Sequence, residues 1–448
     1  MKLNAAGDTT VIRVLYDISR LGECHQQPHA RTGLARVIEN VASGLVDSKE
    51  CDVSFCAAES YGALEGATNY LAQHPRLNST PLLRPRKSPL KEKLNARLRE
   101  INADLAGQAL RDPADGAGVS QSLSKFRVRA RIERRLIAQL GAVEYERPFD
   151  PRWLRSVDIF HSPFHALPQS ATRAPRFLTV YDLIPILYPQ FCVASQIQFS
   201  RELLQSIRPP DWVLCISTAT MNDLCNYTGI DPGRVVVTYL AAEPGLFYPC
   251  DDAQLKASIR RQYHIPDGPY LLSINTLEPR KNLEQVVRCF AKIVREQNIA
   301  DLNLVLAGAQ GWLAEALLAE ISSYADLRDR IIMTGYVSDE HLAPLYSDAL
   351  GFLFLSHYEG FGLPALEAMQ CGVPVIASNV SSIPEVVGEA GRLCDPNDTE
   401  ACCQALLDLY RSSALRESMA KKSLARAAEF SWEKCVQQTI SAYQRSLA

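Results

Sequence analysis

The sequence predicts an α/β protein of two domains, each built on a mainly parallel β-sheet with helices on both faces. With 448 residues, the chain is too long for one ordinary hydrophobic core. Short apolar runs alternate with helical patterns in two separate series, which a stretch rich in Pro and Asp divides at residues 244–269. Strands that alternate with helical stretches are typical of parallel sheets, because the connecting helices must cross over the sheet faces.

The first series begins with a strand at residues 11–16, a loop, a helical pattern through residues 35–45 and a second strand at residues 52–57. This β-loop-α-β order is the start of a doubly wound sheet. Its further strands are expected at residues 159–160, 176–181, 212–216 and 235–238. We therefore assign residues 1–245 to an N-terminal Rossmann-like domain.

The second series predicts strands at residues 270–274, 302–307, 331–334, 351–355 and 373–377. We assign residues 246–430 to a second Rossmann-like domain and residues 431–448 to a final helix. In open sheets of this kind, ligands bind outside the carboxyl ends of the strands. A ligand is therefore expected in a cleft between the two domains.

Residues 81–140 fit neither series and are predicted to be a basic helical insertion in the N-terminal domain. They contain 14 Arg and Lys residues against six Asp and Glu, in two helical patterns separated by a breaker at residues 112–118. The two helices are either a solvated surface, a lid, or a basic surface that meets anionic lipid headgroups. The last interpretation would suit an enzyme that acts on a lipid-linked acceptor.

The composition is that of a globular enzyme, with 47% hydrophobic and 22% charged residues. A formal charge of −3 argues against nucleic acid as a partner. The 13 cysteines are scattered without a C-x-x-C motif or a Cys/His ligand cluster, which indicates reduced, mostly buried thiols. Since the sequence shows neither a signal peptide nor an apolar stretch of about 18 residues, we expect a cytoplasmic protein whose membrane contact, if any, is peripheral at the inner face.

The strongest functional pattern is residues 359–367, Glu-Gly-Phe-Gly-Leu-Pro-Ala-Leu-Glu, directly after a predicted buried strand. Pro364 suits the first turn of a short helix. Gly360 and Gly362 allow a ligand to approach the backbone amides, and the helix N-terminus favours an anion such as a diphosphate. Glu359 and Glu367 could accept hydrogen bonds from the hydroxyl groups of a sugar and of a ribose.

A second pattern, residues 275–282, Asn-Thr-Leu-Glu-Pro-Arg-Lys-Asn, follows the first strand of the second series. It places Arg280 and Lys281 at a predicted helix start, on the same edge as the glutamate loop. Two fixed cations there could neutralise the charge that builds on a departing diphosphate, in place of a metal ion. No Asp-x-Asp motif stands at a strand end, and we therefore expect neither a metal nor another cofactor.

Together these motifs resemble the family-four retaining glycosyltransferases of GT-B type, and particularly the bacterial mannosyltransferases that build O-antigen and exopolysaccharide chains. The resemblance also includes Gly335-Tyr336-Val337 and residues 391–396, and extends over most of the chain apart from the insertion. It implies two Rossmann-like domains that face each other across a cleft, with a C-terminal helix that returns to the N-terminal domain.

The resemblance assigns roles to individual residues of the donor site. Glu359 should contact the hydroxyls of the donor sugar, Glu367 the ribose, and Arg280 and Lys281 the diphosphate. The loop residues Gly360, Phe361, Gly362 and Leu363 should offer backbone groups to the sugar and the phosphates. Asn275 stands where many relatives carry arginine, so Arg280 and Lys281 would hold more of the phosphate charge.

The N-terminal half carries weaker signals of the same family. Asp17 and residues 31–37, Arg-Thr-Gly-Leu-Ala-Arg-Val, resemble a glycine loop in which Gly33 lets amides approach the donor phosphate. Residues 180–185 resemble a His-Asp-Leu segment with Tyr181 in place of the histidine. Asp182 is the candidate for contact with the acceptor or the reacting sugar, although a structural turn carboxylate is an equal alternative. For His161 and His165 a satisfied loop histidine is the favoured interpretation.

The resemblance implies transfer of a hexose from a nucleoside diphosphate sugar, with retention at the anomeric carbon, to a hydroxyl of a glycan or lipid-linked glycan. Positioning and electrostatic stabilisation would be the protein's contribution. We expect GDP-mannose as the donor, with GDP-fucose or a UDP-hexose as alternatives. A catalytically silent nucleotide-sugar-binding protein is an alternative of another class, whereas an NAD enzyme is disfavoured because no G-x-G-x-x-G follows the first strand.

Overall fold

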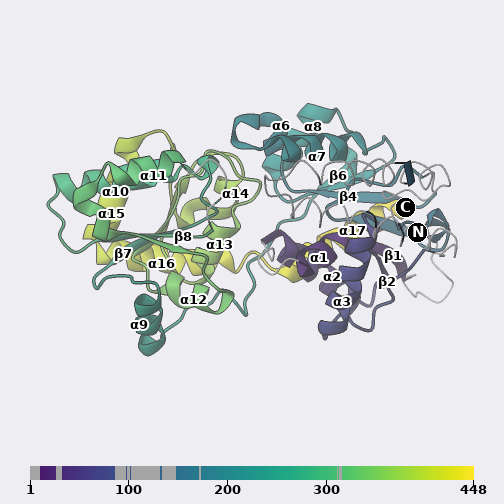
Figure 1. Ribbon diagram of the computed structural model, residues 1–448, viewed down its shortest axis with the longest axis horizontal. Helices are drawn as coiled ribbons and strands as arrows, with labels where there is room; N and C mark the ends of the chain where they lie inside the picture. The colour runs from purple at the N-terminus through teal and green to yellow at the C-terminus, as the bar shows by residue number, and fades with distance from the viewer. Residues whose placement is uncertain are drawn as a thin grey trace, which may run out of the picture.

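The chain folds into two lobes, each built around one six-stranded parallel sheet (Figure 1). The computed structural model describes residues 11–26, 33–85, 97, 101, 132–133, 148–170, 173–309, 311 and 315–448. Every strand pairing between named strands is parallel. The predicted α/β class, with two Rossmann-like sheets, is therefore confirmed.

The first sheet, here called the N-terminal sheet, has the strand order β2-β1-β3-β4-β5-β6. Its strands are β1 (Ile12–Asp17), β2 (Cys51–Cys56), β3 (Ile159–Ser162), β4 (Arg176–Val180), β5 (Trp212–Cys215) and β6 (Val235–Val237). All residues of β3 and β4 are buried, as a strand covered on both faces requires. The helices of this lobe are α1 (Ser19–His25), α2 (Gly33–Asp47), α3 (Tyr61–Gln73), α6 (Ile184–Leu187), α7 (Ala194–Gln205) and α8 (Thr218–Thr228), with 3₁₀ turns η1 (Pro151–Arg155), η2 (Pro189–Phe191) and η3 (Pro232–Arg234).

The second sheet, the C-terminal sheet, has the order β12-β11-β10-β7-β8-β9. Its strands are β7 (Tyr270–Ile274), β8 (Asn303–Ala307), β9 (Ile331–Gly335), β10 (Gly351–Phe354), β11 (Val375–Ser378) and β12 (Arg392–Cys394). Its helices are α9 (Ala253–Gln262), α10 (Leu283–Glu296), α11 (Glu315–Ser322), α12 (Asp339–Ser347), α13 (Leu363–Gln370), α14 (Ile383–Val387), α15 (Thr399–Arg411) and α16 (Ser413–Ala427), with η4 (Pro279–Lys281), η5 (Ala325–Arg330) and η6 (Gly388–Ala390).

The last helix, α17 (Trp432–Leu447), crosses back to the first lobe, where Figure 1 shows it beside α2. The Tyr443 ring is fully buried there against Phe177 of β4. Its hydroxyl lies 2.6 Å from Nδ1 of His161, and the side-chain amide of Gln444 donates a hydrogen bond of 2.8 Å to Glu50. The predicted return of the C-terminal helix is therefore confirmed.

The predicted strands are all present, with ends that shift by one or two residues. One strand, β12, was expected only as part of a family motif at residues 391–396. Its three residues are too few for a period-two pattern to be recognised in sequence.

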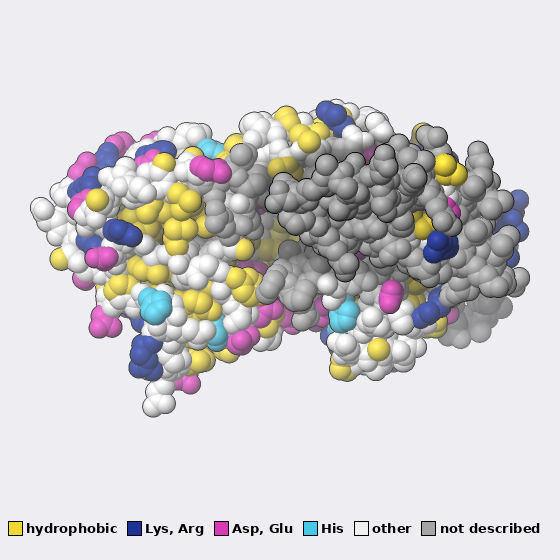
Figure 2. Space-filling view, viewed as in Figure 1, with side chains coloured by type: hydrophobic (Ala, Val, Ile, Leu, Met, Phe, Trp, Pro, Cys, Tyr) yellow, Lys and Arg dark blue, Asp and Glu magenta, His cyan; other side chains and the backbone are white. Residues whose placement is uncertain are grey.

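The structure leaves the role of the basic insertion untested, because most of residues 81–140 lie outside the described part of the chain. Within it, Arg97 and Glu133 form an ion pair that joins the two predicted helical stretches. Among the described residues, no helix is long and apolar enough to cross a membrane. On the face shown in Figure 2, basic and acidic side chains are interspersed over the lobe of the C-terminal sheet.

The cysteines are free thiols, and all but Cys192 and Cys225 are buried, as predicted. Although they are scattered in sequence, Cys289 and Cys403 meet where α10 packs on α15, and the Cys403 thiol lies 3.8 Å from the Cys289 carbonyl oxygen. This packing holds the helix that follows Lys281 against the body of the C-terminal lobe.

Candidate active site

The site begins where the order of the C-terminal sheet reverses, between the neighbouring strands β7 and β10. The chain leaves these two strands toward opposite sides of the sheet, which opens a crevice at their carboxyl ends. The loop after β7 carries Arg280 and Lys281, and the loop after β10 carries Glu359. The two sequence patterns therefore meet because of strand order, although 78 residues separate Lys281 from Glu359.

A buried ion-pair network forms at this crevice. The Lys281 ammonium donates a hydrogen bond of 2.7 Å to Oε1 of Glu359, and an Arg280 guanidinium nitrogen lies 2.8 Å from Oε2. Arg280 also donates to the carbonyl of Tyr358 at 2.7 Å and to Glu278 at 2.5 Å. The side chains of Glu359 and Lys281 are only 9% and 11% exposed, so this network is shielded from water.

The network fixes the charge of the central carboxylate. Burial opposes ionisation of Glu359, but Arg280 and Lys281 outweigh it and lower its pKa to about 2. Burial and the neighbouring Arg280 lower the pKa of Lys281. Glu359 is therefore ionised at neutral pH and keeps lone pairs beyond those used by its two cations, with which it can accept hydrogen bonds from hydroxyl groups.

The glutamate loop leads into α13 as the sequence predicts. Gly362 has φ +111°, a left-handed conformation that suits glycine, and Leu363 and Pro364 form the first turn of the helix. The Ser382 hydroxyl donates hydrogen bonds of 2.9 Å to the carbonyls of Glu359 and Phe361 and so holds the loop from the side of α14.

Glu367 lies on α13, apart from the Arg280–Lys281 network. The Tyr346 hydroxyl donates a hydrogen bond of 3.2 Å to its carboxylate. Burial raises the pKa of Glu367 to about 7, against the opposing influence of Arg36 and Tyr346. This carboxyl group therefore changes its charge near neutral pH, whereas Glu359 does not.

Asn275 directly follows β7 and is buried, and the side-chain atom that lacks a hydrogen-bond partner among the described residues is an acceptor, Oδ1. Its amide nitrogen donates to the Ser273 hydroxyl at 2.9 Å, and its Oδ1 has no hydrogen-bond partner among the described residues. The carbonyl oxygen of an amide suits a hydroxyl rather than a phosphate oxygen. This geometry leaves Arg280 and Lys281 as the cationic side chains nearest the crevice.

The N-terminal lobe closes directly on the glutamate loop. A methyl group added at Gly360 would lie 2.3 Å from the carbonyl oxygen of Tyr181 and 3.0 Å from Cβ of Asp182. The Ser217 hydroxyl donates a hydrogen bond of 2.7 Å to the Gly360 carbonyl. The sequence predicts that Gly360 makes room for a ligand, but in this structure the backbone of the opposite lobe occupies that space.

Glu385 of α14 makes a second contact between the lobes that the sequence did not reveal. Its carboxylate accepts hydrogen bonds from the backbone amides of Thr218 and Ala219 at 2.8 and 2.7 Å, at the N-terminus of α8. The Tyr239 hydroxyl donates to the same group at 3.0 Å. An anionic side chain at a helix N-terminus is favoured by the helix dipole, and this contact holds the lobes together.

The remaining predicted residues of the N-terminal half also lie near the glutamate loop. Gly33 begins α2, and a methyl group there would lie 3.6 Å from Leu363 of α13. Asp182 accepts a hydrogen bond of 2.9 Å from the Ile184 amide, as a turn carboxylate would. Burial raises the pKa of Asp182, against the influence of Arg280. Arg31 and Thr32 of the predicted glycine loop lie outside the described residues.

A cavity of about 630 Å³ opens beside this site. Asp182, Glu278 and Arg280 line one side of it, and residues of α1, α7 and the loop after β3 line the rest. His165 belongs to this wall, so its position differs from that of a plain loop histidine. His161, by contrast, is satisfied and structural, since it bonds Tyr443 and Thr179, and burial lowers its pKa to about 3.

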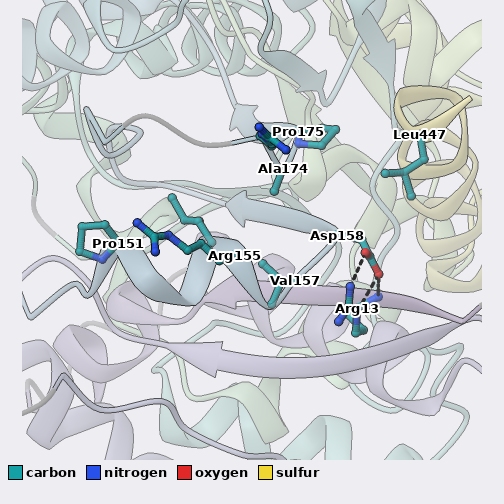
Figure 3. A pocket seen from close by; sticks show the side chains of 10 residues that line it. Arg13, Pro151, Arg155, Val157, Asp158, Ala174, Pro175 and Leu447 are labelled. Carbon is teal, nitrogen blue, oxygen red and sulfur yellow. Dashed lines mark hydrogen bonds and ion pairs between the residues drawn. The ribbon is translucent and has the colours of Figure 1, made fainter.

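A second cavity, of about 730 Å³, lies at the opposite edge of the N-terminal sheet (Figure 3). There Arg13 of β1 forms an ion pair of 2.8 Å with Asp158, just before β3, and Leu447 of α17 closes one side. These are the amino ends of the strands, whereas ligands of doubly wound sheets bind at the carboxyl ends. The crevice beside the first cavity is therefore the candidate for the catalytic site.

Comparison with known proteins agrees with this geometry. The family model Glycosyl transferases group 1 matches residues 256–426, which include both patterns of the crevice. O-antigen chain mannosyltransferase B of Escherichia coli is 34% identical over 287 residues, which cover 64% of this chain and 74% of that protein. Serotype-specific mannosyltransferase WbdA of Escherichia coli is 29% identical over 269 residues, or 60% of this chain and 33% of that longer protein.

Solved structures share the two-lobed architecture. Sucrose-phosphate synthase from Thermosynechococcus elongatus aligns with a TM-score of 0.62 and 20% identity, covering 97% of this chain and 98% of that one. At this identity the likeness concerns the fold alone, but it includes both lobes.

Proposed function

The chain belongs to the group 1 glycosyltransferases, and from that premise we propose that it transfers mannose from GDP-mannose, with retention of the anomeric configuration, to a hydroxyl of a glycan or lipid-linked glycan. The observation that carries the proposal is the buried network of Glu359, Arg280 and Lys281 at the switch point of the C-terminal sheet. The 34% identity to an O-antigen mannosyltransferase supports the choice of a mannosyl donor.

The network suits a reaction in which negative charge develops on a leaving diphosphate. Arg280 and Lys281 are held in place by carboxylates before a donor arrives, so little reorganisation is needed when the charge forms. As the acceptor oxygen bonds to the anomeric carbon, the bond from that carbon to the diphosphate breaks, and a phosphate oxygen of the donor takes the acceptor proton. Glu359 would hold the sugar hydroxyls in this step without forming a bond to the anomeric carbon.

Closure of the two lobes has a chemical purpose in this proposal. Contacts of Gly360 with Ser217 and of Glu385 with α8 keep water away from the bound donor. Transfer would then proceed without a metal ion, because the two cations of the chain neutralise the diphosphate. Unchanged kcat in excess EDTA would support this part, and loss of activity that Mg²⁺ or Mn²⁺ restores would refute it.

The donor is tested with a panel of GDP-mannose, GDP-fucose and UDP-hexoses by thermal shift, because a selective ligand raises the apparent stability of the fold. GDP-mannose should raise Tm most. If UDP-sugars raise Tm and GDP-sugars do not, the mannosyl assignment is wrong.

The anomeric outcome needs a separate measurement. NMR of the first product formed should give an α-linked mannoside, whereas a β-linked product would refute retention.

We further propose that the enzyme works in the cytoplasm with peripheral contact at the inner face of the membrane, through the basic residues 81–140. Flotation with liposomes, with and without anionic lipid, tests this contact. Equal recovery in both preparations would refute it.

A further inference from the structure

The cavity of about 730 Å³, here called the amino-end cavity, lies where the neighbouring strands β1, β3 and β4 begin. The strand order reverses between β1 and β3, and the carboxyl ends of the same strands lead to the cavity of about 630 Å³. These strands have four to six residues each, so about 13–20 Å of sheet separates the two cavities. A ligand in the amino-end cavity would therefore not contact the ion-pair network.

Four charged side chains line the amino-end cavity, and three of them are arginines. Arg13 and Asp158 neutralise each other, because Nη2 and Nε of the arginine donate hydrogen bonds of 2.8 and 3.1 Å to the two carboxylate oxygens. The guanidinium groups of Arg155 and Arg173 make no ion pair or hydrogen bond with any described residue. The wall therefore carries two positive charges that no described carboxylate neutralises.

These two arginines come from different walls of the cavity. Arg155 ends the turn η1, which precedes β3, whereas Arg173 lies just before β4. Figure 3 shows Arg155 on one side of the cavity and Ala174 with Pro175 on another, apart from the joined pair of Arg13 and Asp158. A ligand with several acceptor oxygens is favoured in such a place, because each planar guanidinium group can donate two parallel hydrogen bonds to it.

Apolar side chains form much of the remaining wall. Leu154 and Val157 line the cavity from η1 and the segment after it, and Leu447 of α17 closes one side. The side chain of Leu447 is 41% exposed, so an apolar group of a ligand would remove part of its surface from water. The amino-end cavity thus combines two cations with an apolar surface.

This combination selects among anions. A phosphate monoester carries about −1.5 to −2 charges at pH 7, which matches two arginines better than the single charge of a carboxylate. The cavity is within the size range of roughly 300–1,000 Å³ for ligand pockets, so it has room for an organic group on the phosphate. Because Arg13 occupies both oxygens of Asp158, that group meets apolar side chains rather than a carboxylate open to hydroxyls.

We propose that the amino-end cavity is a second ligand site, which binds a phosphate monoester carried on an apolar group. Arg155 and Arg173 hold the phosphate, and Leu154, Val157 and Leu447 contact the apolar group. The site goes beyond the proposed transfer reaction, since its ligand lies on the far side of the N-terminal sheet from the crevice and is neither donor nor acceptor.

Octyl phosphate is the probe, with ethyl phosphate and octyl glucoside as its two comparisons. Ethyl phosphate has the same charge without the long chain, and octyl glucoside has the same chain without the charge. Each buried methylene group raises affinity by about fourfold, so octyl phosphate should bind the full chain at least tenfold more tightly than either comparison in isothermal titration calorimetry. A ratio below tenfold in either comparison would overturn the proposal.

Variants assign this binding to the amino-end cavity. Arg155→Gln and Arg173→Gln should each raise the Kd of octyl phosphate at least fivefold, and both side chains are exposed, so the fold should tolerate the changes. Leu447→Trp narrows the cavity without altering its charge and should also raise the Kd. Unchanged affinity in both arginine variants would overturn the proposal.

Arg152→Gln is the matched control for the loss of charge. Arg152 is an exposed arginine of the same turn, lies outside the cavity wall and donates a hydrogen bond of 2.8 Å to Asp150. Its replacement removes one positive charge from the same region and should leave the Kd within twofold. An equal loss of affinity in Arg152→Gln would show a general effect of charge and would contradict a built site.

A variant of the crevice separates this site from the proposed donor site. Lys281→Ala should leave the Kd of octyl phosphate unchanged, and the arginine variants should leave the Tm shift caused by GDP-mannose unchanged. Loss of octyl phosphate binding in Lys281→Ala, with no loss in Arg155→Gln and Arg173→Gln, would place the phosphate in the crevice and overturn the proposal.

Vesicles distinguish the two sources of such a ligand, a lipid headgroup and a soluble ester. Flotation with phosphatidylcholine vesicles, with and without phosphatidic acid, compares the wild type with Arg155→Gln and Arg173→Gln. Recovery that needs phosphatidic acid and falls in both variants supports the site and identifies a lipid headgroup. Equal recovery of all three proteins, with octyl phosphate binding still dependent on the arginines, supports the site and identifies a soluble ester.

Discussion

Each lobe has a polar site at the switch point of its sheet. The two sites differ in how far their polar groups are paired with one another. At the switch point of the C-terminal sheet, Arg280, Lys281 and Glu359 satisfy one another. At the switch point of the N-terminal sheet, Nε of Arg20 is buried without a hydrogen-bond partner among the described residues, beside a cavity of about 630 Å³. The difference indicates that the polar site of the C-terminal lobe is preorganised for charge, whereas the polar site of the N-terminal lobe has a buried donor available to a ligand.

The largest loss of activity should come from a change in the ion-pair network of the C-terminal lobe. Lys281→Ala removes one of the two cations and leaves Glu359 with Arg280 alone, so kcat should fall by about 10³-fold. Single-turnover transfer from GDP-mannose measures this loss.

The matched control for that change is Lys292→Ala on α10, the helix that follows Lys281. Lys292 forms its ion pair with Glu400 at the surface and should leave kcat within a factor of about two. Equal losses in the two variants would mean that helix stability, rather than diphosphate neutralisation, explains the effect.

The next prediction tests whether catalysis requires contact between the two lobes. In Gly360→Ala the added methyl group would collide with the Tyr181 carbonyl and hold the lobes apart by a fraction of an ångström. Because such a displacement misaligns donor and acceptor, kcat should fall on the order of 10²-fold. Binding of GDP-mannose to the C-terminal lobe should persist, as isothermal titration calorimetry would reveal.

Gly245→Ala is the comparison for this variant, since only a Glu243 oxygen lies within 4 Å of its added methyl, at 3.9 Å. It should behave as the wild type. Loss of donor binding in Gly360→Ala would show instead that the loop itself, and not closure, had been damaged.

A smaller effect, the pH dependence of donor affinity, should distinguish Glu367 from Glu359. Ribose hydroxyls donate to an ionised carboxylate, so bound donor favours deprotonated Glu367, whose pKa burial raises to about 7. Affinity for GDP-mannose should therefore increase as pH rises through about 7, by about tenfold between pH 6 and pH 8.

Calorimetric titration with GDP-mannose measures this pH dependence. Because no acceptor is present, titratable groups that contact only the acceptor do not affect the measured affinity. Glu367→Gln should flatten the profile. A pH dependence that survives in this variant would assign the titrating group elsewhere, because Glu359, with a pKa of about 2, stays ionised over the whole range.

The sequence predicted the site of the C-terminal lobe better than that of the N-terminal lobe for a physical reason. Residues 275–282 and 359–367 each form a compact local pattern behind a buried strand, and strand order alone brings them together. Glu385 and Thr218 are 167 residues apart in the sequence, and no local pattern predicts the contact between them. His165 likewise looks like a loop histidine until the fold places Glu23 and Glu59 on either side of its ring.

Gly360 illustrates the same limit within a motif that the sequence did identify. A glycine beside a ligand and a glycine beside another backbone look the same in sequence, because both positions exclude a Cβ. Only the facing lobe, with the Tyr181 carbonyl at the position a methyl group would need, distinguishes them.

The smallest effect on activity should come from a substitution in α17, a helix that belongs to neither site. Tyr443→Phe removes the hydroxyl that lies 2.6 Å from His161 and leaves a buried imidazole nitrogen unpaired, which should lower the free energy of unfolding by about 1–3 kcal/mol. Urea denaturation measures this change, with Tyr227→Phe as control because that side chain is 52% exposed. Since the hydroxyl lies in the core of the N-terminal lobe, kcat and the affinity for GDP-mannose should be unchanged. A fall in kcat without loss of stability would instead mean that the returning helix sets the position of the N-terminal lobe relative to the C-terminal lobe, and that catalysis depends on this position.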